Sequence, residues 1–227
     1  MITIGIPVYQ QVDFLVQAIE SALNQTVPCE IIICDDGSND GSEKIVNDYN
    51  KDPRIKIIHQ CNKGLASARN SIIMNMTGDF FLPLDSDDIL QENAVERIQE
   101  IIKQNPDADI IAPSFKCFGL SQEEVILMPN PTLEDFKTAN RIAYCAAIRK
   151  SALLEVGGYS PRMVEGYEDL HLWVNLLSTG KKIITIPEVL WKYRIKEKSM
   201  YRDITPEIHK KLIAQINKDF PLCPLTF

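Results

Sequence analysis

The chain has 227 residues, enough to bury one sizeable hydrophobic core, and this length fits a single domain. Hydrophobic residues make up 45% of it and charged residues 24%, as in ordinary soluble globular proteins. The formal net charge of −7 argues against a nucleic-acid binder that works by neutralising phosphates, because such a protein needs a basic surface.

Neither the cysteines nor the apolar segments indicate export or a membrane span. The six cysteines are scattered without a C-x-x-C pair, which favours free thiols in a reducing cytosol over disulfides or a zinc site. No signal peptide precedes the apolar run that starts at Ile2. No apolar stretch approaches the roughly 20 residues that a bilayer span requires. We therefore expect a cytoplasmic protein.

The first half of the chain alternates short apolar runs with helical periodicity, which is the pattern of a βαβ sheet. The expected strands are Ile2–Val8, Ile31–Cys34, Ile55–His59, Phe80–Leu84 and Ile110–Ala112. The helices expected between them cover 12–23, 45–49, Gly64–Met76 and Asn93–Lys103. The continuous apolar run Ile31–Cys34 is typical of a central parallel strand that is buried on both faces.

Beyond Pro113 the pattern loosens, and residues 114–140 show no strong period. The elements expected after that segment are an ordered stretch Tyr144–Val156, a helix Tyr167–Thr179, a strand Ile183–Pro187 and an amphipathic helix Pro206–Phe220.

Polar residues follow three of the expected strands, as Pro7-Val8-Tyr9, Asp35-Asp36-Gly37 and Asp85-Ser86-Asp87-Asp88. In open α/β sheets, ligands bind beyond the carboxyl ends of parallel strands. Carboxylates at neighbouring strand ends repel one another unless a cation compensates, so Mg²⁺ or Mn²⁺ together with phosphate oxygens is the economical explanation. Each acidic segment alone also fits ordinary turn or helix-capping chemistry.

Five motifs that occur in order carry a resemblance to a known family. They are Ile6-Pro7-Val8-Tyr9, Asp35 to Ser42, Asn62 to Asn70, Leu84 to Asp88, and Gly166-Tyr167-Glu168-Asp169. The set resembles the family 2 glycosyltransferases of GT-A fold, from Ile2 to about Ser199. Each motif alone is weak, but five in order at compatible spacings are specific.

The resemblance implies an α/β fold: a single GT-A domain with a Rossmann-like, mostly parallel central sheet and flanking helices. We expect this domain to cover 1–205, with a nucleotide-binding half over 1–113 and an acceptor half over 114–205. A C-terminal amphipathic helix and tail would follow over 206–227.

The resemblance also implies a nucleotide-sugar donor site. Pro7 and Tyr9 would line the nucleoside pocket. Asp35 or Asp36 would accept a hydrogen bond from the base, which suits uracil N3–H, and the sequence does not choose between them. Asp87 would ligate the metal that bridges the donor phosphates, with Asp85 as ribose or metal partner.

Four further residues would contact the base or the phosphates. The resemblance assigns Asn62 and Arg69 to this role, and Arg69 lies on the first turns of a helix, where the dipole favours an anion. A surface ion pair is the alternative for Arg69. Arg194 and Lys196 would contact the diphosphate, although a solvated basic strand is an alternative. Lys196 stands where the family often has a His. Where that His is a metal ligand or a phosphate contact, an ammonium could still meet the diphosphate but could not ligate the metal while protonated.

Asp169 is the expected general base, at the start of the helix that carries Leu170, Trp173 and Leu177. An acceptor hydroxyl is a poor nucleophile until its proton is removed in the transition state. Glu168 is the less favoured candidate, and both acids could instead merely complement the helix N-terminus.

The resemblance therefore implies an inverting, metal-dependent hexosyl- or N-acetylhexosaminyl-transferase that uses a nucleotide-diphosphate-sugar, with UDP-sugar favoured. The acceptor would be a glycan or lipid-linked hydroxyl in cell-surface polysaccharide or glycan biosynthesis. The alternative is a catalytically silent nucleotide-sugar-binding module of the same fold. The basic segment between Lys181 and Arg202 and the C-terminal helix could place the protein at the inner face of an anionic membrane. Packing of that helix on the domain is the preferred interpretation.

Overall fold

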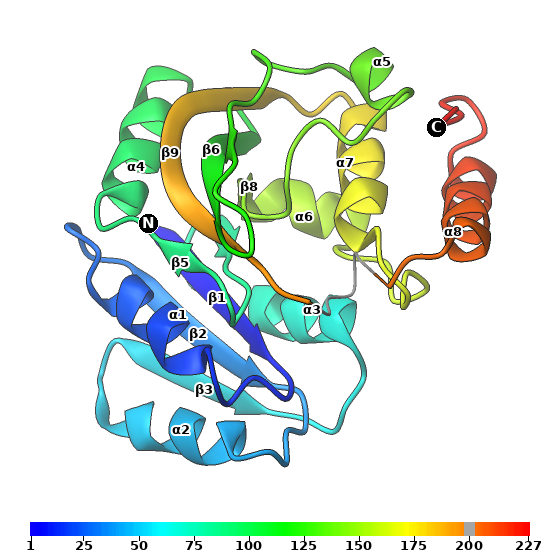
Figure 1. Ribbon diagram of the computed structural model, residues 1–227. Coiled ribbons are helices and arrows are strands. Elements are labelled where there is room, and N and C mark those ends of the chain that lie inside the picture. The colour runs from blue at the N-terminus through cyan, green and yellow to red at the C-terminus, as the bar shows by residue number, and fades with distance from the viewer. Residues whose placement is uncertain (198–202) are drawn as a thin grey trace.

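The computed structural model describes residues 1–197 and 203–227, so Lys198, Ser199 and Arg202 lie outside the described residues. Its centre is one curled, nine-stranded sheet of order β3-β2-β1-β4-β8-β6-β9-β5, with β7 paired to β6 (Figure 1). Strands from both halves of the chain share this sheet, which confirms the predicted α/β architecture.

The elements largely follow the predicted order. The strands are β1 (Ile2–Val8), β2 (Glu30–Asp35), β3 (Ile55–His59), β4 (Phe80–Pro83), β5 (Ile89–Leu90), β6 (Ile110–Gly119), β7 (Glu124–Val125), β8 (Ala147–Arg149) and β9 (Ile183–Ile195). The helices are α1 (Leu15–Leu23), α2 (Ser42–Asp48), the 3₁₀ turn η1 (Tyr49–Lys51), α3 (Leu65–Asn75), α4 (Ala94–Gln104), α5 (Leu133–Phe136), α6 (Lys150–Val156), α7 (Glu168–Ser178) and α8 (Pro206–Asp219).

The long ladders of the sheet are parallel. Strand β1 pairs in parallel with β2 and β4, and β2 pairs in parallel with β3. The antiparallel pairs β4–β8, β5–β9, β6–β7 and β6–β8 are short. Because β1, β2 and β4 run in the same direction, the polar segments that follow them meet at one edge of the sheet.

Two strands are longer than the sequence predicts. Strand β6 continues past Pro113 to Gly119, and β9 continues past Pro187 to Ile195. The two pair in parallel, with register shifts around Ser114 that leave Pro187 and Glu188 out of the ladder. Such a bulge lets a proline remain within a strand and changes which side chains face the core. The loosened pattern after Pro113 therefore conceals a strand.

Helices cover both faces of the sheet. Helices α1, α2 and α4 bury one hydrophobic cluster, and α3, α6 and α7 bury the other. Helix α8 lies outside α7 in Figure 1 and buries Leu212, Ile213 and Ile216 in the second cluster. Its apolar face therefore packs on the domain. Among the described residues, no helix combines the length and the apolar character needed to cross a bilayer.

Candidate active site

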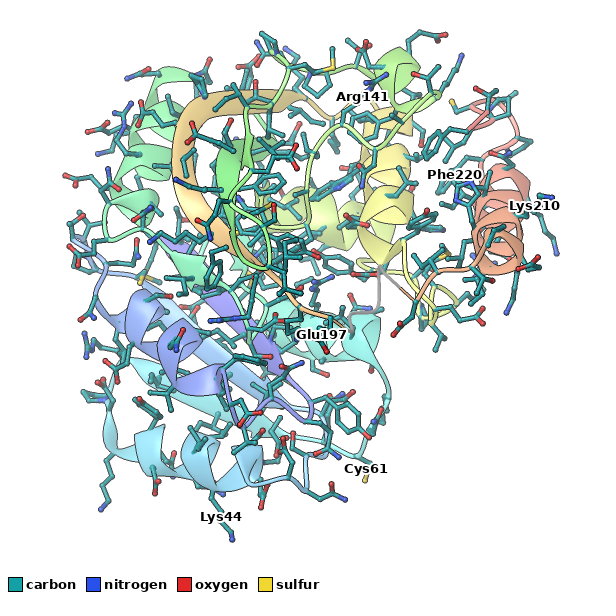
Figure 2. The ribbon with its side chains drawn as sticks, viewed as in Figure 1. Lys44, Cys61, Arg141, Glu197, Lys210 and Phe220 are labelled. Carbon is teal, nitrogen blue, oxygen red and sulfur yellow. The ribbon has the colours of Figure 1, made fainter. Side chains whose placement is uncertain are left out.

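A cavity of about 1150 Å³ opens beyond the carboxyl ends of β1, β2 and β4. All of the predicted site residues except Asp35 and Arg69 line it. These lining residues are Pro7, Tyr9, Asp36, Asn62, Asp85, Asp87, Asp169, Arg194 and Lys196. Figure 2 shows Glu197, two residues beyond β9, near the middle of the view, whereas Lys44 and Lys210 point outward.

The two acidic residues at the end of β2, Asp35 and Asp36, have different surroundings. Asp36 is 3% exposed and accepts hydrogen bonds from the backbone N–H groups of Lys63 (2.9 Å) and Gly64 (2.8 Å). Asp35 instead lies 3.2 Å from Nδ1 of His59, behind the cavity wall. Of the two candidates for contacting a base, Asp36 is therefore the one that lines the cavity.

The cavity wall next to Asp36 is partly exposed to solvent. Pro7 is buried at the end of β1, and Tyr9 keeps 47% of its surface exposed. Asn62 is exposed, and its Oδ1 accepts a 3.2 Å hydrogen bond from Gly64. This part of the cavity offers an apolar surface, an aromatic ring and amide groups, which suits a planar base with polar edges.

A buried tyrosine organises the acidic segment after β4. The Tyr144 hydroxyl accepts a 3.0 Å hydrogen bond from the Asp85 N–H and donates one of 2.5 Å to Oδ2 of Asp88. The other Asp88 oxygen accepts a 2.7 Å hydrogen bond from the Arg194 N–H. Burial, and then the charges of Asp87 and Asp85, raise the pKa of Asp88 well above its ordinary value. Asp88 thus anchors the segment to β9.

Arg69 lies behind the cavity, fully buried between two carboxylates. Its guanidinium contacts Oδ1 of Asp85 and Oε1 of Glu168, each at 2.7 Å. The rings of Tyr144 and Tyr159 flank it at 5.2 Å each. Burial raises the pKa of Asp85 to about 6 although Arg69 opposes this shift. Arg69 is therefore a buried ion-pair centre. It is not the surface ion pair that the sequence left open, and it does not line the cavity where the predicted contact with a base or phosphate would be made.

Asp169 occupies the first turn of α7 and faces the cavity. Its Oδ1 accepts a 2.7 Å hydrogen bond from the Leu170 N–H, and Oδ2 accepts one of 3.3 Å from Asn140. Burial first, and the adjacent Glu168 carboxylate second, raise the pKa of Asp169 to about 7. Glu168 is occupied by Arg69, whereas Asp169 has no ion-pair partner in the described part of the chain.

Arg194 and Lys196 both reach the acidic segment. Lys196 Nζ lies 2.5 Å from Oδ2 of Asp87, and Arg194 Nε donates a 2.7 Å hydrogen bond to the Asp87 carbonyl oxygen. The Arg194 guanidinium also lies over the rings of Phe14 and Phe118, at 4.5 and 4.2 Å. Both cations therefore have fixed positions at the cavity wall and are not members of a freely solvated strand.

Sequence reasoning missed three residues that shape this site: Tyr144, Asn140 and Gln11. Asn140 ends the segment without a recognisable period, Tyr144 opens the ordered stretch expected after it, and Gln11 follows the bend after β1. No local signal marks them, because each acts on a partner far away in the sequence.

The oxygen ligands at Asp85 and Asp87 suit Mg²⁺ or Mn²⁺. Arg69 takes one oxygen of Asp85 and Lys196 takes one of Asp87, so the second oxygen of each stays outside these ion pairs. The described residues contain no group of three or more His, Cys, Asp or Glu side chains that could hold a metal ion. The protein's share of a metal site would thus be small, and phosphate oxygens would have to complete the coordination.

Comparisons with known proteins identify a family and similar folds. The family model described as glycosyl transferase family 2 matches residues 3–157. The glycosyltransferase GlyG of Streptococcus pneumoniae is 30% identical over 224 residues, which cover 89% of this chain and 73% of GlyG. The chondroitin synthase of Pasteurella multocida is 34% identical over 141 residues. That match covers 55% of this chain, and the chain spans only 15% of the synthase.

Solved structures of similar fold are more distant in sequence. The S. aureus TarS segment 1-349, in complex with UDP-GlcNAc, superposes with a TM-score of 0.83 at 16% identity, and the match covers 99% of this chain and 68% of that segment. A Pyrobaculum calidifontis mannosyltransferase, in complex with GDP-Man and Mn²⁺, gives 0.69 at 15% identity and covers 96% of this chain and 70% of that one. At these identities the likeness establishes the fold alone.

Proposed function

Because the chain belongs to glycosyl transferase family 2, we propose that it transfers a sugar from a nucleotide-diphosphate-sugar to an acceptor hydroxyl with inversion at the anomeric carbon. One observation carries the proposal. The acidic segment Asp85–Asp87 and Asp169 line the same cavity; the segment follows β4, and Asp169 lies on α7. A donor phosphate site and a candidate base thus face one volume.

The donor is a UDP-sugar in this proposal. The nucleoside lies against Pro7 and Tyr9, and Asp36 accepts the hydrogen bond of the base. Asn62 adds an amide at the same wall, and Arg194 and Lys196 contact the diphosphate. TarS, a neighbour of the same fold, was solved with UDP-GlcNAc and with UDP, which supports this choice of nucleotide.

Asp87, with Asp85, would hold a Mn²⁺ or Mg²⁺ ion together with the donor phosphates. When bound, such an ion neutralises the charge that develops on the leaving diphosphate. The mannosyltransferase of similar fold was solved with Mn²⁺, which supports divalent metal use at this kind of site.

Asp169 is the general base. Its carboxylate removes the proton of the acceptor hydroxyl while that oxygen bonds to the anomeric carbon and the bond to the diphosphate breaks. A pKa near 7 places about half of the Asp169 carboxyls in the ionised form at neutral pH. A single in-line displacement of this kind inverts the anomeric configuration. Arg69 fixes Asp85 and Glu168 from behind without touching the cavity.

The acceptor is a glycan or lipid-linked hydroxyl, and the product belongs to polysaccharide biosynthesis. The names of the chondroitin and hyaluronan synthase relatives support this context and a hexosyl or N-acetylhexosaminyl donor. The free cysteines suit a reducing compartment such as the cytoplasm. Attachment to the inner membrane face through α8 is not part of the proposal, because α8 buries its apolar residues on the domain.

A thermal-shift screen of nucleotides and nucleotide-sugars with Mn²⁺, followed by a turnover assay, tests the proposal. A ligand at 100 times its Kd adds about 2.7 kcal/mol of stability, so a specific nucleotide stands out clearly. Asp87→Ala should abolish the metal-dependent part of the shift. A protein that no nucleotide stabilises would contradict the proposal. Binding without donor hydrolysis or transfer to any acceptor would instead favour the silent binding module.

A further inference from the structure

Lys196 forms an ion pair with Asp87, whose carboxylate is the candidate metal ligand. Its ammonium lies 2.5 Å from Oδ2 of Asp87, 3.5 Å from Oε1 of Gln11 and 5.1 Å from the centre of the Phe14 ring. Both partners are largely buried, with exposed side-chain fractions of 21% for Lys196 and 18% for Asp87. The contact is therefore a defined position at the cavity wall and not a loose surface pair.

The acidic segment holds three carboxylates, and a different protein donor engages each one. Asp85 is bound by the fully buried guanidinium of Arg69, and Asp88 by the buried Tyr144 hydroxyl. Asp87 is bound by Lys196, whose ammonium is partly exposed and lines the cavity. Of these donors, Lys196 is the one that can exchange its partner without unpacking the core.

An ammonium and a divalent cation compete for the same carboxylate. The ammonium offers three N–H donors and no lone pair, so it cannot join a coordination sphere. A metal at Asp87 would also repel the neighbouring ammonium. A diphosphate removes both difficulties, because its oxygens ligate the metal and accept hydrogen bonds from the displaced ammonium.

We propose that Lys196 is the intramolecular counter-ion of Asp87, and that it keeps the affinity for a metal alone low until a nucleoside diphosphate draws the ammonium away. The inference rests on the proposed function, since it assumes a diphosphate and a metal at this site. It assigns Lys196 two contacts in sequence: the Asp87 carboxylate in the free protein and a phosphate oxygen in the donor complex. Metal and nucleotide then favour each other's binding, and the coupling is reciprocal.

Two single-ligand titrations test this assignment. Mn²⁺ alone is titrated into the protein and free Mn²⁺ is followed by electron paramagnetic resonance. UDP alone is titrated in the presence of EDTA. Lys196→Gln removes the competing charge and the phosphate contact together. It should therefore bind Mn²⁺ alone roughly tenfold more tightly than the wild type, and UDP alone roughly tenfold more weakly.

Opposite changes of the two affinities distinguish this role from a general disturbance of the fold. Lys196→Arg keeps the charge and should bind Mn²⁺ alone as weakly as the wild type. Lys192→Gln is the matched control, because Lys192 lies on β9 four residues before Lys196 and does not line the cavity, so both affinities should stay unchanged. A melting curve of each variant without ligand confirms folding.

An unchanged or weaker Mn²⁺ affinity of Lys196→Gln, with normal UDP binding by the wild type, would overturn the inference and leave the proposed function standing. Failure of the wild type to bind UDP with or without Mn²⁺ would overturn both. Equal effects of Lys192→Gln and Lys196→Gln would show a nonspecific charge effect and would also overturn the inference.

Discussion

At the scale of single residues, the site separates two adjacent carboxylates by their surroundings. Glu168 forms a buried ion pair with Arg69, whose guanidinium lies 2.7 Å from its carboxylate oxygen. Asp169 faces the cavity, and burial together with Glu168 raises its pKa to about 7. Surroundings that make the pKa values of two neighbouring titratable groups differ commonly mark acid–base roles. Asp169 is therefore the stronger candidate for the base.

Asp169→Asn should lower kcat by about 10²- to 10⁴-fold, because the amide cannot accept the acceptor proton. Donor binding should remain normal, because the acidic segment and the nucleoside wall are unchanged. The measurements are turnover with saturating donor and the thermal shift produced by UDP. Near-normal turnover of the variant would show that Asp169 is not the base.

The raised pKa of Asp169 also predicts how activity depends on pH. Below pH about 7 the carboxyl is increasingly protonated, so kcat should fall by up to about tenfold per pH unit. The sign for stability is opposite. A carboxyl whose pKa is raised by folding stabilises the fold most at low pH, and this contribution is lost as the pH rises through about 7. Asp169→Asn should flatten the kcat profile between pH 6 and 8 and the stability profile between about pH 4 and 7. If Asp169→Asn kept the pH dependence of the wild type, that dependence would arise from another titratable group.

Arg69 offers a test of stability rather than of chemistry. Arg69→Met leaves the Asp85 and Glu168 carboxylates without their shared buried partner, which typically costs about 3–5 kcal/mol. Urea unfolding measures this loss. Lys44→Met is the control, since Lys44 is exposed and its substitution should stay within about 0.5 kcal/mol. Equal stability of the two variants would mean that water compensates the carboxylates.

The residue scale also marks the limit of what the sequence predicts about the site. Side chains that follow a strand end, such as Asp36 and Asp87, are found by position, because parallel strands end at one edge. The surroundings of Arg69 were not predictable, since its two partners lie 16 and 99 residues away in the sequence. Tyr144 was missed for the same reason, because its contacts exist only in the folded chain.

At the scale of elements, the parallel first half was predictable and the second half was less so. The run from β1 to β4 shows clean apolar strands separated by helical periodicity, and the structure confirms its order. Strands β6 and β9 were shortened in the prediction because each contains a proline, Pro113 or Pro187. The register shift between them moves the side-chain alternation out of phase, so no single period survives along either strand.

Gly5 tests how closely α3 approaches the sheet. A Cβ atom at Gly5 would lie 2.3 Å from Cε2 of Phe81 and 2.9 Å from Cγ2 of Ile72, both buried side chains. Gly5→Ala should therefore cost about 1–3 kcal/mol through overpacking, measured by chemical unfolding. Adding Phe81→Leu removes the closer clash and should recover part of that loss. An additive double variant would locate the strain elsewhere.

At the scale of the whole molecule, one sheet joins the two halves of the chain. The proposed donor wall, which contains Pro7, Asp36 and Asp87, comes from the ends of β1, β2 and β4, and Asp169 comes from α7 in the second half. The second hydrophobic cluster contains residues of α3, α7 and α8 together. The expected boundary between 1–205 and the C-terminal helix therefore crosses a continuous hydrophobic core. The residues of the proposed donor wall all lie within 1–205.

This arrangement predicts that removing 206–227 separates stability from donor binding. The truncated chain loses Leu212, Ile213, Ile216 and Leu225 from the core, and each buried aliphatic side chain typically contributes about 2–5 kcal/mol. Its melting temperature should fall sharply. Below that temperature UDP should still stabilise it, because Pro7, Asp36 and Asp87 are retained. Ile216→Ala is the milder companion and should lose stability without losing turnover. A truncated chain as stable as the full one would show that α8 is an independent appendage and not part of the core.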